Sequence, residues 1–422
     1  MQEQVCAVNG LQVYSLTNPN LKGFCLSLYV RAGSLFECEN ESGISHLFEH
    51  IVFRNIKAKY KRFYEQLALH GLQFQASTYK EFIRFYITGP HHGFAFAADI
   101  LCHIFDEINI DSLAFEQEKK RIKAEIRESD EKSSLDFFFN KIVWGGTQLE
   151  RTILGSCKVL DNLSRKKVNL FREKVLSAGN CFVYVTGNAG QDGLAILQEK
   201  LAGIHLNQTP TDFTNTVDVN EHFGNRDSKV HIKNDYWHYV KIGFDIDNTV
   251  CTETIADFLH SVLFEDEKAL VYNYLSEDNP IIYSYSSAIE QYDNAGNLSF
   301  WFEVQESKME EALRLIVTLL NDLKNGNFAF DANLQSVLCY TETEADNPSN
   351  QNWTLAYYNH ILSAHPIDYD APLFGRYDFT KEQVVEAAKK VFTTQNMTVA
   401  VKAKKKKVNA ETLEEILKGL DG

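Results

Sequence analysis

Two histidines and one glutamate lie close together near the start of the chain. The segment His46-Leu-Phe-Glu49-His50 follows the pattern H-x-x-E-H. On a helix, His46 and His50 are four residues apart, so both imidazoles project from one face. Two imidazole nitrogens at this spacing can bind one Zn²⁺ ion, and Glu49 beside them can take a proton from a water that the metal activates. The motif therefore indicates metal-assisted hydrolysis, although a helix with two unrelated histidines would look the same.

A catalytic zinc site needs a third protein ligand. The strongly helical segment 115–128 contains Glu118 and Glu125, two turns apart and therefore on one face. One of these carboxylates can bind the metal while the other holds a histidine by a hydrogen bond. The alternative interpretation of this acidic helix is a solvated face.

The elements that must position these residues alternate between two periodicities. Period-two alternation predicts strands over 11–14, 24–30, 72–87 and 181–186. Helical periodicity predicts helices over 42–53, 63–69, 94–108, 112–128 and 164–177. This order predicts an α+β fold in which helices pack on a sheet and carry the H-x-x-E-H motif.

The helix–strand pattern recurs after 216 residues. The helix start at Ser164 and the strand start at Asn180 reappear at Thr380 and Asn396. The same offset carries the strand pattern of 26–30 onto 242–246. Three matches at one offset predict a duplicated domain, with coincidence among common patterns as the alternative.

The duplication predicts two homologous α/β-sandwich halves, each with a mixed or antiparallel sheet and helices packed on it. The first half, 1–210, contains the zinc motif, and the second, 220–422, is expected to be metal-free. The polar stretch 206–220 is the expected linker.

Composition narrows the class of protein. The chain has 422 residues, of which 44% are hydrophobic and 23% charged, close to globular averages, so two or three domains are expected and disorder is excluded. No apolar stretch approaches the ~20 residues of a membrane span. The net charge of −15 argues against a nucleic-acid partner. It suits a basic or polar peptide, or serves only solubility.

Cysteine usage and the N-terminal residues predict a location. The eight cysteines are dispersed and form no C-x-x-C pair, which is typical of reduced thiols in a cytosolic protein. The first residues, Met-Gln-Glu-Gln, lack the basic and apolar regions of a signal peptide. We therefore expect cytoplasmic localisation and no membrane partner, and we interpret the lysine run 404–407 as solvated.

The first half of the chain resembles the pitrilysin superfamily of zinc peptidases, which carry the inverted H-x-x-E-H motif. It is most similar to the mitochondrial processing peptidase branch and its bacterial relatives. The segments that carry the resemblance are 9–13, 30–37, 43–53, 71–86, 118–125 and 147–155. The likeness is dense in the first half and looser after Asn220.

The resemblance implies a role for each motif residue. His46, His50 and Glu125 bind one Zn²⁺ per chain, Glu49 is the general base, and Glu118 supports the ligands from behind. It also implies a clam-like pair of halves that enclose a chamber and admit peptides or unfolded segments.

The resemblance further implies that a peptide substrate adds a strand at a sheet edge beside the metal. The family edge is usually Asn-Ala-x-Thr, and here it is Gln75-Ala76-Ser77-Thr78, so the amide is kept but lengthened. The alternative for this stretch is a strand in the interior of the core.

The second half departs from the family pattern. Relatives often carry an arginine and, seven residues later, a tyrosine that reach the substrate and the developing oxyanion. Tyr283 stands at the tyrosine position, but Ser276 replaces the arginine. Tyr283 is therefore a candidate catalytic residue, with a half-buried strand aromatic as the alternative. The missing arginine predicts a related zinc-less partner subunit, or a homodimer.

Three functions remain open on the sequence. The favoured one is a zinc endopeptidase that cleaves short or unfolded peptides, with precursor or leader peptides as the expected substrates. The second is a zinc-binding scaffold or partner subunit with little catalysis of its own. The third is a structural zinc site, which requires a fourth protein ligand that does not adjoin the motif.

Overall fold

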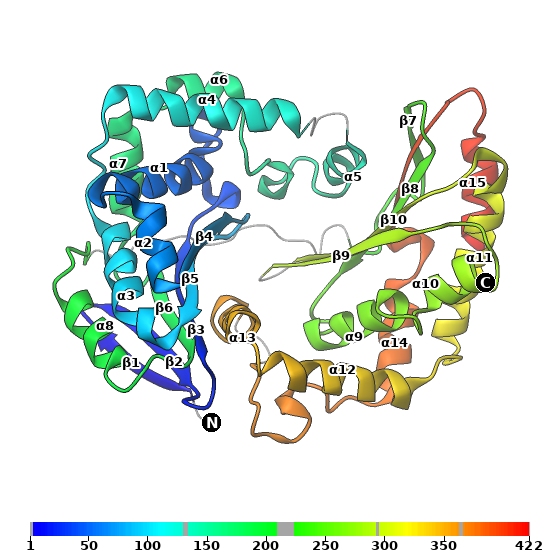
Figure 1. Ribbon diagram of the computed structural model, residues 1–422. Coiled ribbons are helices and arrows are strands. Elements are labelled where there is room, and N and C mark those ends of the chain that lie inside the picture. The colour runs from blue at the N-terminus through cyan, green and yellow to red at the C-terminus, as the bar shows by residue number, and fades with distance from the viewer. Residues whose placement is uncertain (1–2, 130–133, 209–222, 293–294, 363–365, 422) are drawn as a thin grey trace. The chain divides into compact units, whose positions relative to one another are not determined.

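The computed structural model describes residues 3–129, 134–208, 223–292, 295–362 and 366–421 (Figure 1). The chain forms two compact units. Unit 1 comprises Met1–Asp130, Arg151–Asn215 and Glu342–Ile361, and unit 2 comprises Glu131–Glu150, Thr216–Thr341 and Leu362–Gly422. Each unit thus takes one short segment from the other half of the sequence. Most of the expected linker, from residue 209 on, lies outside the described residues.

Unit 1 is built on a six-stranded sheet. Its strands are β1 (Gln4–Val8), β2 (Leu11–Thr17), β3 (Gly23–Arg31), β4 (Gln73–Thr78), β5 (Phe82–Pro90) and β6 (Cys181–Gly187). Its α-helices are α1 (Ile44–Lys59), α2 (Phe63–His70), α3 (Phe94–Cys102), α4 (Ser112–Glu128), α6 (Cys157–Asn162), α7 (Arg165–Val175), α8 (Gly193–Ala202) and α13 (Pro348–Leu355). Helix α13 continues into a π-helical turn, Ala356–Ile361.

Unit 2 is built on a five-stranded sheet. Its strands are β7 (Val230–Asn234), β8 (Tyr239–Ile246), β9 (Tyr285–Gln291), β10 (Gly296–Glu303) and β11 (Met397–Ala403). Its α-helices are α5 (Leu135–Val143), α9 (Glu253–Phe264), α10 (Leu270–Tyr272), α11 (Met309–Lys324), α12 (Phe330–Glu344), α14 (Lys381–Val391) and α15 (Ala410–Leu417).

The two sheets share a topology, except that β1 has no counterpart among the described strands of unit 2. The strand order is β1-β2-β6-β3-β5-β4 in unit 1 and β7-β11-β8-β10-β9 in unit 2. The β2–β6 and β7–β11 pairs are parallel, and all other pairs are antiparallel. Two homologous α/β halves with mixed sheets, as the sequence predicted, are therefore confirmed. The division at 210 and 220 stays a prediction for the duplicated halves of the sequence.

A buried asparagine occupies the same place in each unit. Asn180 donates to Arg31 O (2.8 Å) and Asn396 donates to Asp245 O (2.9 Å), and each also donates to the last carbonyl of the preceding helix, α7 or α14. This bond makes Arg31 equivalent to Asp245, an offset of 214. The predicted offset of 216 therefore holds for the helix and the strand after it but was wrong by two residues for β3. A shift of two leaves every side chain on its face, which is why the pattern did not reveal it.

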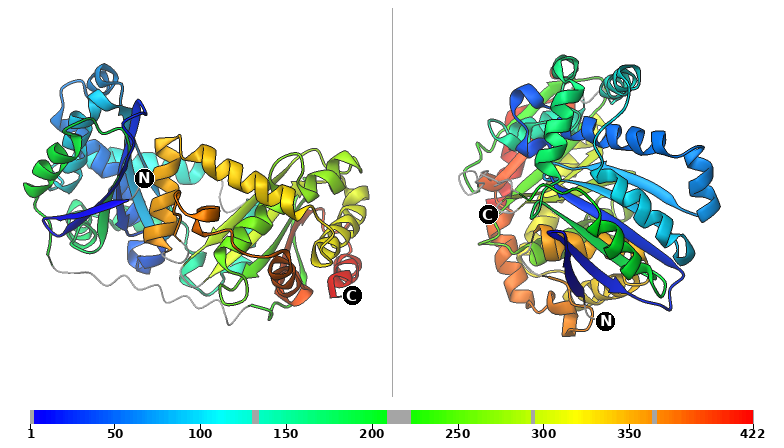
Figure 2. Two further views of the ribbon diagram at one scale, coloured as in Figure 1. Left: turned by 90° about the horizontal axis from the view of Figure 1, so that it is seen from below. Right: turned by 90° about the vertical axis from the view of Figure 1, so that its left-hand side faces the viewer.

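The two faces of the unit 1 sheet differ in chemistry. Leu26, Leu28 and Val30 of β3 point into the apolar core beneath α1, α3 and α7. Ser27 and Tyr29 point to the opposite face, where α13 covers β3 and β6. The left view of Figure 2 shows the orange α13 alongside the blue strands of this unit. A segment from far along the chain therefore completes the unit that contains the H-x-x-E-H motif.

The helices of the described ranges include none that is both long and apolar enough to cross a membrane.

Candidate active site

Helix α1 presents the H-x-x-E-H motif, and its first turn is fixed by a buried carboxylate. Glu37 accepts hydrogen bonds from Gly43 N (2.7 Å) and Ser45 N (2.9 Å), two of the donors that a helix start leaves unpaired. Gly43 adopts φ 89°, and a Cβ there would lie 2.7 Å from Leu154 O. Burial raises the pKa of Glu37 despite these donors. The cap fixes where the helix begins and therefore which way its histidines point.

Three side chains from two helices converge on one point. His46 and His50 come from α1 and Glu125 from α4, and their ligand atoms all lie within 4.8 Å of one another. Glu125 Oε2 is 3.4 Å from His46 Nε2 and 3.8 Å from His50 Nε2. Across the described residues, no other group of three or more histidines, cysteines or carboxylates is gathered this closely.

This donor set fits zinc. Two imidazoles and one carboxylate from separate helices are the ligands of a three-residue catalytic zinc site, which leaves further positions open to water and substrate. The histidines are mostly buried, and the Glu125 side chain is 45% exposed. A structural site would need a fourth ligand, and the cluster contains none among the residues described.

Glu49 lies beside the cluster without belonging to it. Its Oε2 is 3.7 Å from His46 Nδ1 and accepts a hydrogen bond of 2.6 Å from the Thr78 hydroxyl. Burial tends to raise the pKa of Glu49, but His46 and Thr78 outweigh burial and hold it below its ordinary value. The carboxylate is therefore ionised and available to take a proton.

The two histidines differ in basicity. Burial tends to lower the pKa of His46, but Glu49 and Glu125 outweigh burial and raise it above its ordinary value. Burial, together with the neighbouring His46, lowers the pKa of His50.

Glu118 supports His50 from behind. Its Oε2 is 3.4 Å from His50 Nδ1, and the carboxylate is almost fully buried. Arg54 Nε lies 3.0 Å from Glu118 Oε1, and Arg121 Nη1 lies 3.3 Å from Oε2. The two guanidinium groups neutralise a carboxylate that burial alone would disfavour. Glu118 is thereby held as a hydrogen-bond acceptor that orients the His50 ring.

The predicted substrate strand lies at the edge of the unit 1 sheet. Gln75, Ala76, Ser77 and Thr78 belong to β4, which among the described strands pairs with β5 alone and so leaves its other edge free. The alternative of an interior strand was therefore wrong. Ala76 and Thr78 face α1 and the motif, whereas Gln75 and Ser77 face the other way.

Tyr283 and Ser276 lie in unit 2. Ser276 is in the π-helical turn Asn273–Glu277, and Tyr283 precedes β9 with 98% of its surface exposed. The alternative of Tyr283 as a half-buried strand aromatic was therefore wrong. Its role in catalysis stays a prediction.

Three residues that position the site were missed by the sequence analysis. Glu37 lies seven residues before Ile44, outside the spacing of a capping box, so no local pattern marked it as the cap of this helix. Arg54 stands one turn after His50, and Arg121 stands three residues after Glu118. Both spacings place the arginine beside the site, but surface arginines at such spacings are common, so the pattern alone did not single them out.

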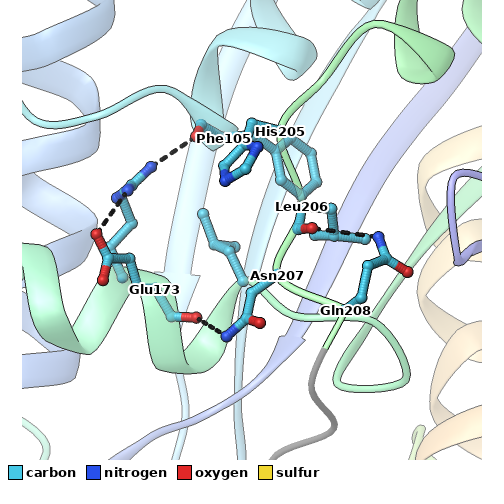
Figure 3. A pocket seen from close by; sticks show the side chains of 8 residues that line it. Phe105, Glu173, His205, Leu206, Asn207 and Gln208 are labelled. Carbon is cyan, nitrogen blue, oxygen red and sulfur yellow. Dashed lines mark hydrogen bonds and ion pairs between the residues drawn. The ribbon is translucent and has the colours of Figure 1, made fainter.

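A pocket elsewhere in unit 1 contains none of these residues (Figure 3). It has a volume of about 450 Å³ and lies between α7, the turn at Phe105 and the segment 205–208. Arg172 donates to Phe105 O (2.8 Å) at its wall, and Asn207 donates to Glu173 O. Its polar groups are thus largely engaged with the protein itself.

Comparison with protein families gives two matches. Residues 12–156 match the family described as "Insulinase (Peptidase family M16)", and residues 162–332 match "Peptidase M16 inactive domain". The first match contains the whole metal cluster, and the second contains Ser276 and Tyr283.

Three curated proteins illustrate the similarity. An uncharacterized zinc protease of Rickettsia felis is 27% identical over 197 residues, 46% of this chain and 48% of that protein. The uncharacterized zinc protease YmxG of Bacillus subtilis is 21% identical over 321 residues, 75% of this chain and 77% of its own length. The mitochondrial-processing peptidase subunit beta of Dictyostelium discoideum is 21% identical over 50% of this chain and 45% of that subunit. The chain thus spans about half the length of the first and third relatives.

Solved structures share the fold. A protease from Helicobacter pylori superposes with a TM-score of 0.81 at 18% identity, covering 95% of this chain and 99% of that chain. The periplasmic protease PqqL from Escherichia coli superposes with a TM-score of 0.78 at 15% identity, covering 100% of this chain and 50% of that chain.

Proposed function

The chain belongs to the pitrilysin superfamily of zinc peptidases, in its mitochondrial processing peptidase-like branch, and on that premise we propose that it is a zinc-dependent endopeptidase of short or unfolded peptides. The observation that carries the proposal is the convergence of His46, His50 and Glu125 within 4.8 Å, with the Glu49 carboxylate beside them. A scaffold has no need of an ionised, unliganded carboxylate next to a three-residue metal site.

The residues of this chain have separate tasks in the proposed reaction. When bound, zinc supplies Lewis-acid polarisation of the scissile carbonyl and lowers the pKa of a water. Glu49 takes the proton of the attacking water and passes it to the leaving nitrogen. Thr78 fixes one oxygen of Glu49 and, together with His46, holds the pKa of Glu49 below its ordinary value. Glu118 and its two arginines keep the His50 ring in place.

Strand β4 is the proposed binding site for the peptide backbone. Its free edge offers the main-chain groups of Gln75–Thr78 to an added strand, and its end is tied to Glu49 through Thr78. Because the peptide must be extended to pair with this edge, folded proteins are poor substrates. Precursor or leader peptides in the cytoplasm meet that requirement.

A partner subunit is part of the proposal. Ser276 stands where relatives carry an arginine, and a serine cannot supply a positive charge to a developing oxyanion. One relative is named as the beta subunit of a peptidase, which supports a partner subunit for this chain. We expect a zinc-less family member that brings the arginine and tyrosine, or a second copy of this chain, while Tyr283 contributes its hydroxyl.

One specific observation favours a second function. The match of 162–332 to a domain described as inactive, together with Ser276, is compatible with a zinc-binding scaffold or partner subunit. Such a chain would keep its metal and bind peptides without cleaving them.

A cleavage assay separates the two functions. The zinc-loaded chain is incubated with a panel of unstructured peptides, with and without a chelator, alone and with a related subunit that carries the arginine and tyrosine. Chelator-sensitive cleavage supports the peptidase, and cleavage that needs the second subunit supports the partner. Cleavage by the chain alone at ordinary enzyme rates would contradict the proposal that a partner subunit is required.

The role of Ser276 can be tested within this chain. We expect Ser276→Arg to raise the cleavage rate of the chain alone by at least tenfold, because one donor to an oxyanion is worth about 10²–10³ in rate. Ser307→Arg, on an exposed serine of the same unit, is the matched control and should change nothing.

A further inference from the structure

The face of the unit 1 sheet that points away from the motif carries a cluster of aromatic rings at the β4 edge. Tyr79 stacks on Phe82 with ring centroids 4.5 Å apart, and Trp353 lies 5.1 Å from Tyr79 and 5.7 Å from Phe82. Tyr357, one turn further along, stacks on Trp353 at 5.6 Å and 8°. Trp353 and Tyr79 are only half-buried, so the cluster is open to solvent.

A buried arginine forms the floor of the cluster. Arg84 is 6% exposed, and its guanidinium carbon lies 4.1 Å from the Tyr86 ring and 5.4 Å from the Trp353 ring. It donates to Asn352 Oδ1 (3.2 Å), which fixes α13 and therefore Trp353 against the sheet. The rings are thus held in a preformed arrangement and need not be ordered by a ligand.

Ser77 carries a small side chain on this face of β4. It pairs with Arg84 of β5 on the face that also carries Gln75, and Tyr79 follows the end of the strand. Gln75 is held by the Tyr86 hydroxyl on one side, and Tyr79 is held by Phe82 and Trp353 on the other. The serine side chain is small, its hydroxyl hydrogen-bonds Tyr79, and it lies at the edge where no strand of the described residues pairs, so a side chain of an added strand can reach the rings.

A strand added to β4 would direct every second side chain toward this aromatic face. Side chains of an added strand alternate between faces in step with those of β4, and cross-strand neighbours lie about 4.5–5.5 Å apart. The residue opposite Thr78 faces Glu49. The residue opposite Ser77 faces the rings and is therefore adjacent to the position nearest the general base.

We propose that Trp353, together with Tyr79 and Tyr86, forms a specificity subsite for a large aromatic or aliphatic side chain of the peptide, at the position opposite Ser77. The inference rests on the proposed function, because it takes β4 as the peptide-binding edge. It adds that the subsite is built by a segment of the C-terminal half, and it narrows the substrate to peptides with bulky apolar residues at alternate positions.

The test measures binding in the Glu49→Gln background, so that cleavage is not required. Two fluorescein-labelled nine-residue peptides carry either Phe or Ala at every second position, with Ser between, and a third carries Asp there. Fluorescence anisotropy gives the Kd of each. We expect the Phe peptide to bind about tenfold tighter than the Ala peptide, as for one well-packed aromatic contact.

Variants assign that preference to the rings. Trp353→Ala should reduce the difference between the Phe and Ala peptides to about twofold or less, and Trp353→Phe should retain most of it. Ser77→Phe, which adds bulk at this position of β4 and leaves the sequence of α13 unchanged, should weaken the binding of the Phe peptide alone. Trp237→Ala, on a tryptophan that is 55% exposed in unit 2, is the matched control and should change no Kd. Unchanged zinc content checks the fold of each variant.

Each outcome decides. Loss of the preference in Trp353→Ala and in Ser77→Phe supports the subsite. Equal binding of the Phe and Ala peptides, a preference that survives both variants, or no binding of any peptide overturns it. A preference for the Asp peptide overturns it too, because the charge of Arg84 would then be recognised instead of the rings. If the protein with Glu49 intact cleaves peptides but shows no preference for Phe over Ala, the proposed peptidase activity stands and only the subsite is contradicted. If the preference for Phe depends on the rings but no peptide is cleaved, the subsite stands and the peptidase activity is contradicted.

Discussion

The hydroxyl of Thr78 donates a 2.6 Å hydrogen bond to Glu49 Oε2. This bond joins the free edge of the sheet to the helix that presents the metal-binding histidines. The strand that we propose to bind the peptide and the carboxylate that we propose to accept the proton are therefore positioned together. Their relative placement does not depend on a flexible loop.

Thr78→Val should move the acid limb of activity to higher pH. The Thr78 hydroxyl and His46 hold the pKa of Glu49 below its ordinary value against the opposing effect of burial. Without the hydroxyl the pKa of Glu49 rises, so a smaller fraction of the base is ionised at a given low pH. The kcat/KM profile between pH 4 and 8 measures the shift, and Thr78→Ser should restore the original limb. An unchanged acid limb in Thr78→Val would show that Thr78 does not influence the pKa of the general base.

His50→Ala should abolish stable zinc binding. One of the three converging ligands is lost, and two remaining groups cannot form a catalytic zinc site. Metal content after dialysis, measured by mass spectrometry, should fall to background, whereas exposed His92→Ala should leave it at the wild-type level. Full zinc content in His50→Ala would show that the metal binds elsewhere.

Glu118→Gln should weaken zinc binding by about 10–100-fold while all three ligands remain, because the loss of a ligand's supporting hydrogen bond typically has this effect. The neutral amide also leaves Arg54 and Arg121 without their carboxylate. Competition with a chromogenic chelator gives the Kd. Glu116→Gln, on an exposed glutamate of the same helix, is the control. If Glu118→Gln and Glu116→Gln bound zinc with equal affinity, Glu118 would be a purely structural residue.

Asp99→Asn should destabilise the protein at neutral pH but not in acid. Asp99 accepts from Tyr60 (2.6 Å) and Lys200 (2.9 Å), and these partners outweigh burial and hold its pKa below 3.8. A carboxylate whose pKa is lower in the folded than in the unfolded state stabilises the folded protein at pH values above the unfolded-state pKa. This stabilisation is lost as the pH falls through the folded-state pKa. We expect Asp99→Asn to lower the free energy of unfolding by about 1 kcal/mol at pH 7, a small value because the carboxylate is partly exposed.

Urea unfolding from pH 7 down to pH 3 measures this contribution. The difference in midpoint between wild type and Asp99→Asn should be constant above about pH 5 and should shrink below it. A difference that persists unchanged into acid would mean that packing, and not charge, is affected.

The sequence predicted the local elements well because their signals are local. Helix α7 begins after the cap Ser164 and α14 after Thr380, at the helix starts that the periodicity and the repeat indicated. The pair His46 and His50 was predictable from the spacing on one helix, and the acidic helix offered Glu118 and Glu125 as candidates for the third ligand. The choice of Glu125 came from the resemblance to the pitrilysin superfamily, and the structure gathers Glu125 with the two histidines.

The sequence did not predict which segment covers which sheet. Helix α13, with Trp353, covers the unit 1 sheet, whereas α5 from the first half packs on β8 and β11 of unit 2. Both helices are short, and helical periodicity gives the buried face of a helix but not the sheet that buries it. The aromatic cluster of Tyr79 and Trp353 joins residues that are distant in the chain, so no spacing could reveal it.

The most direct test of the catalytic site compares wild type with Glu49→Gln in zinc content and peptide cleavage on the same preparations, with the partner subunit added if cleavage requires it. We predict equal zinc content and a rate lower by about 10²–10⁴-fold in the variant, because general-base catalysis contributes about this factor. Cleavage at the wild-type rate by zinc-loaded Glu49→Gln would contradict the account.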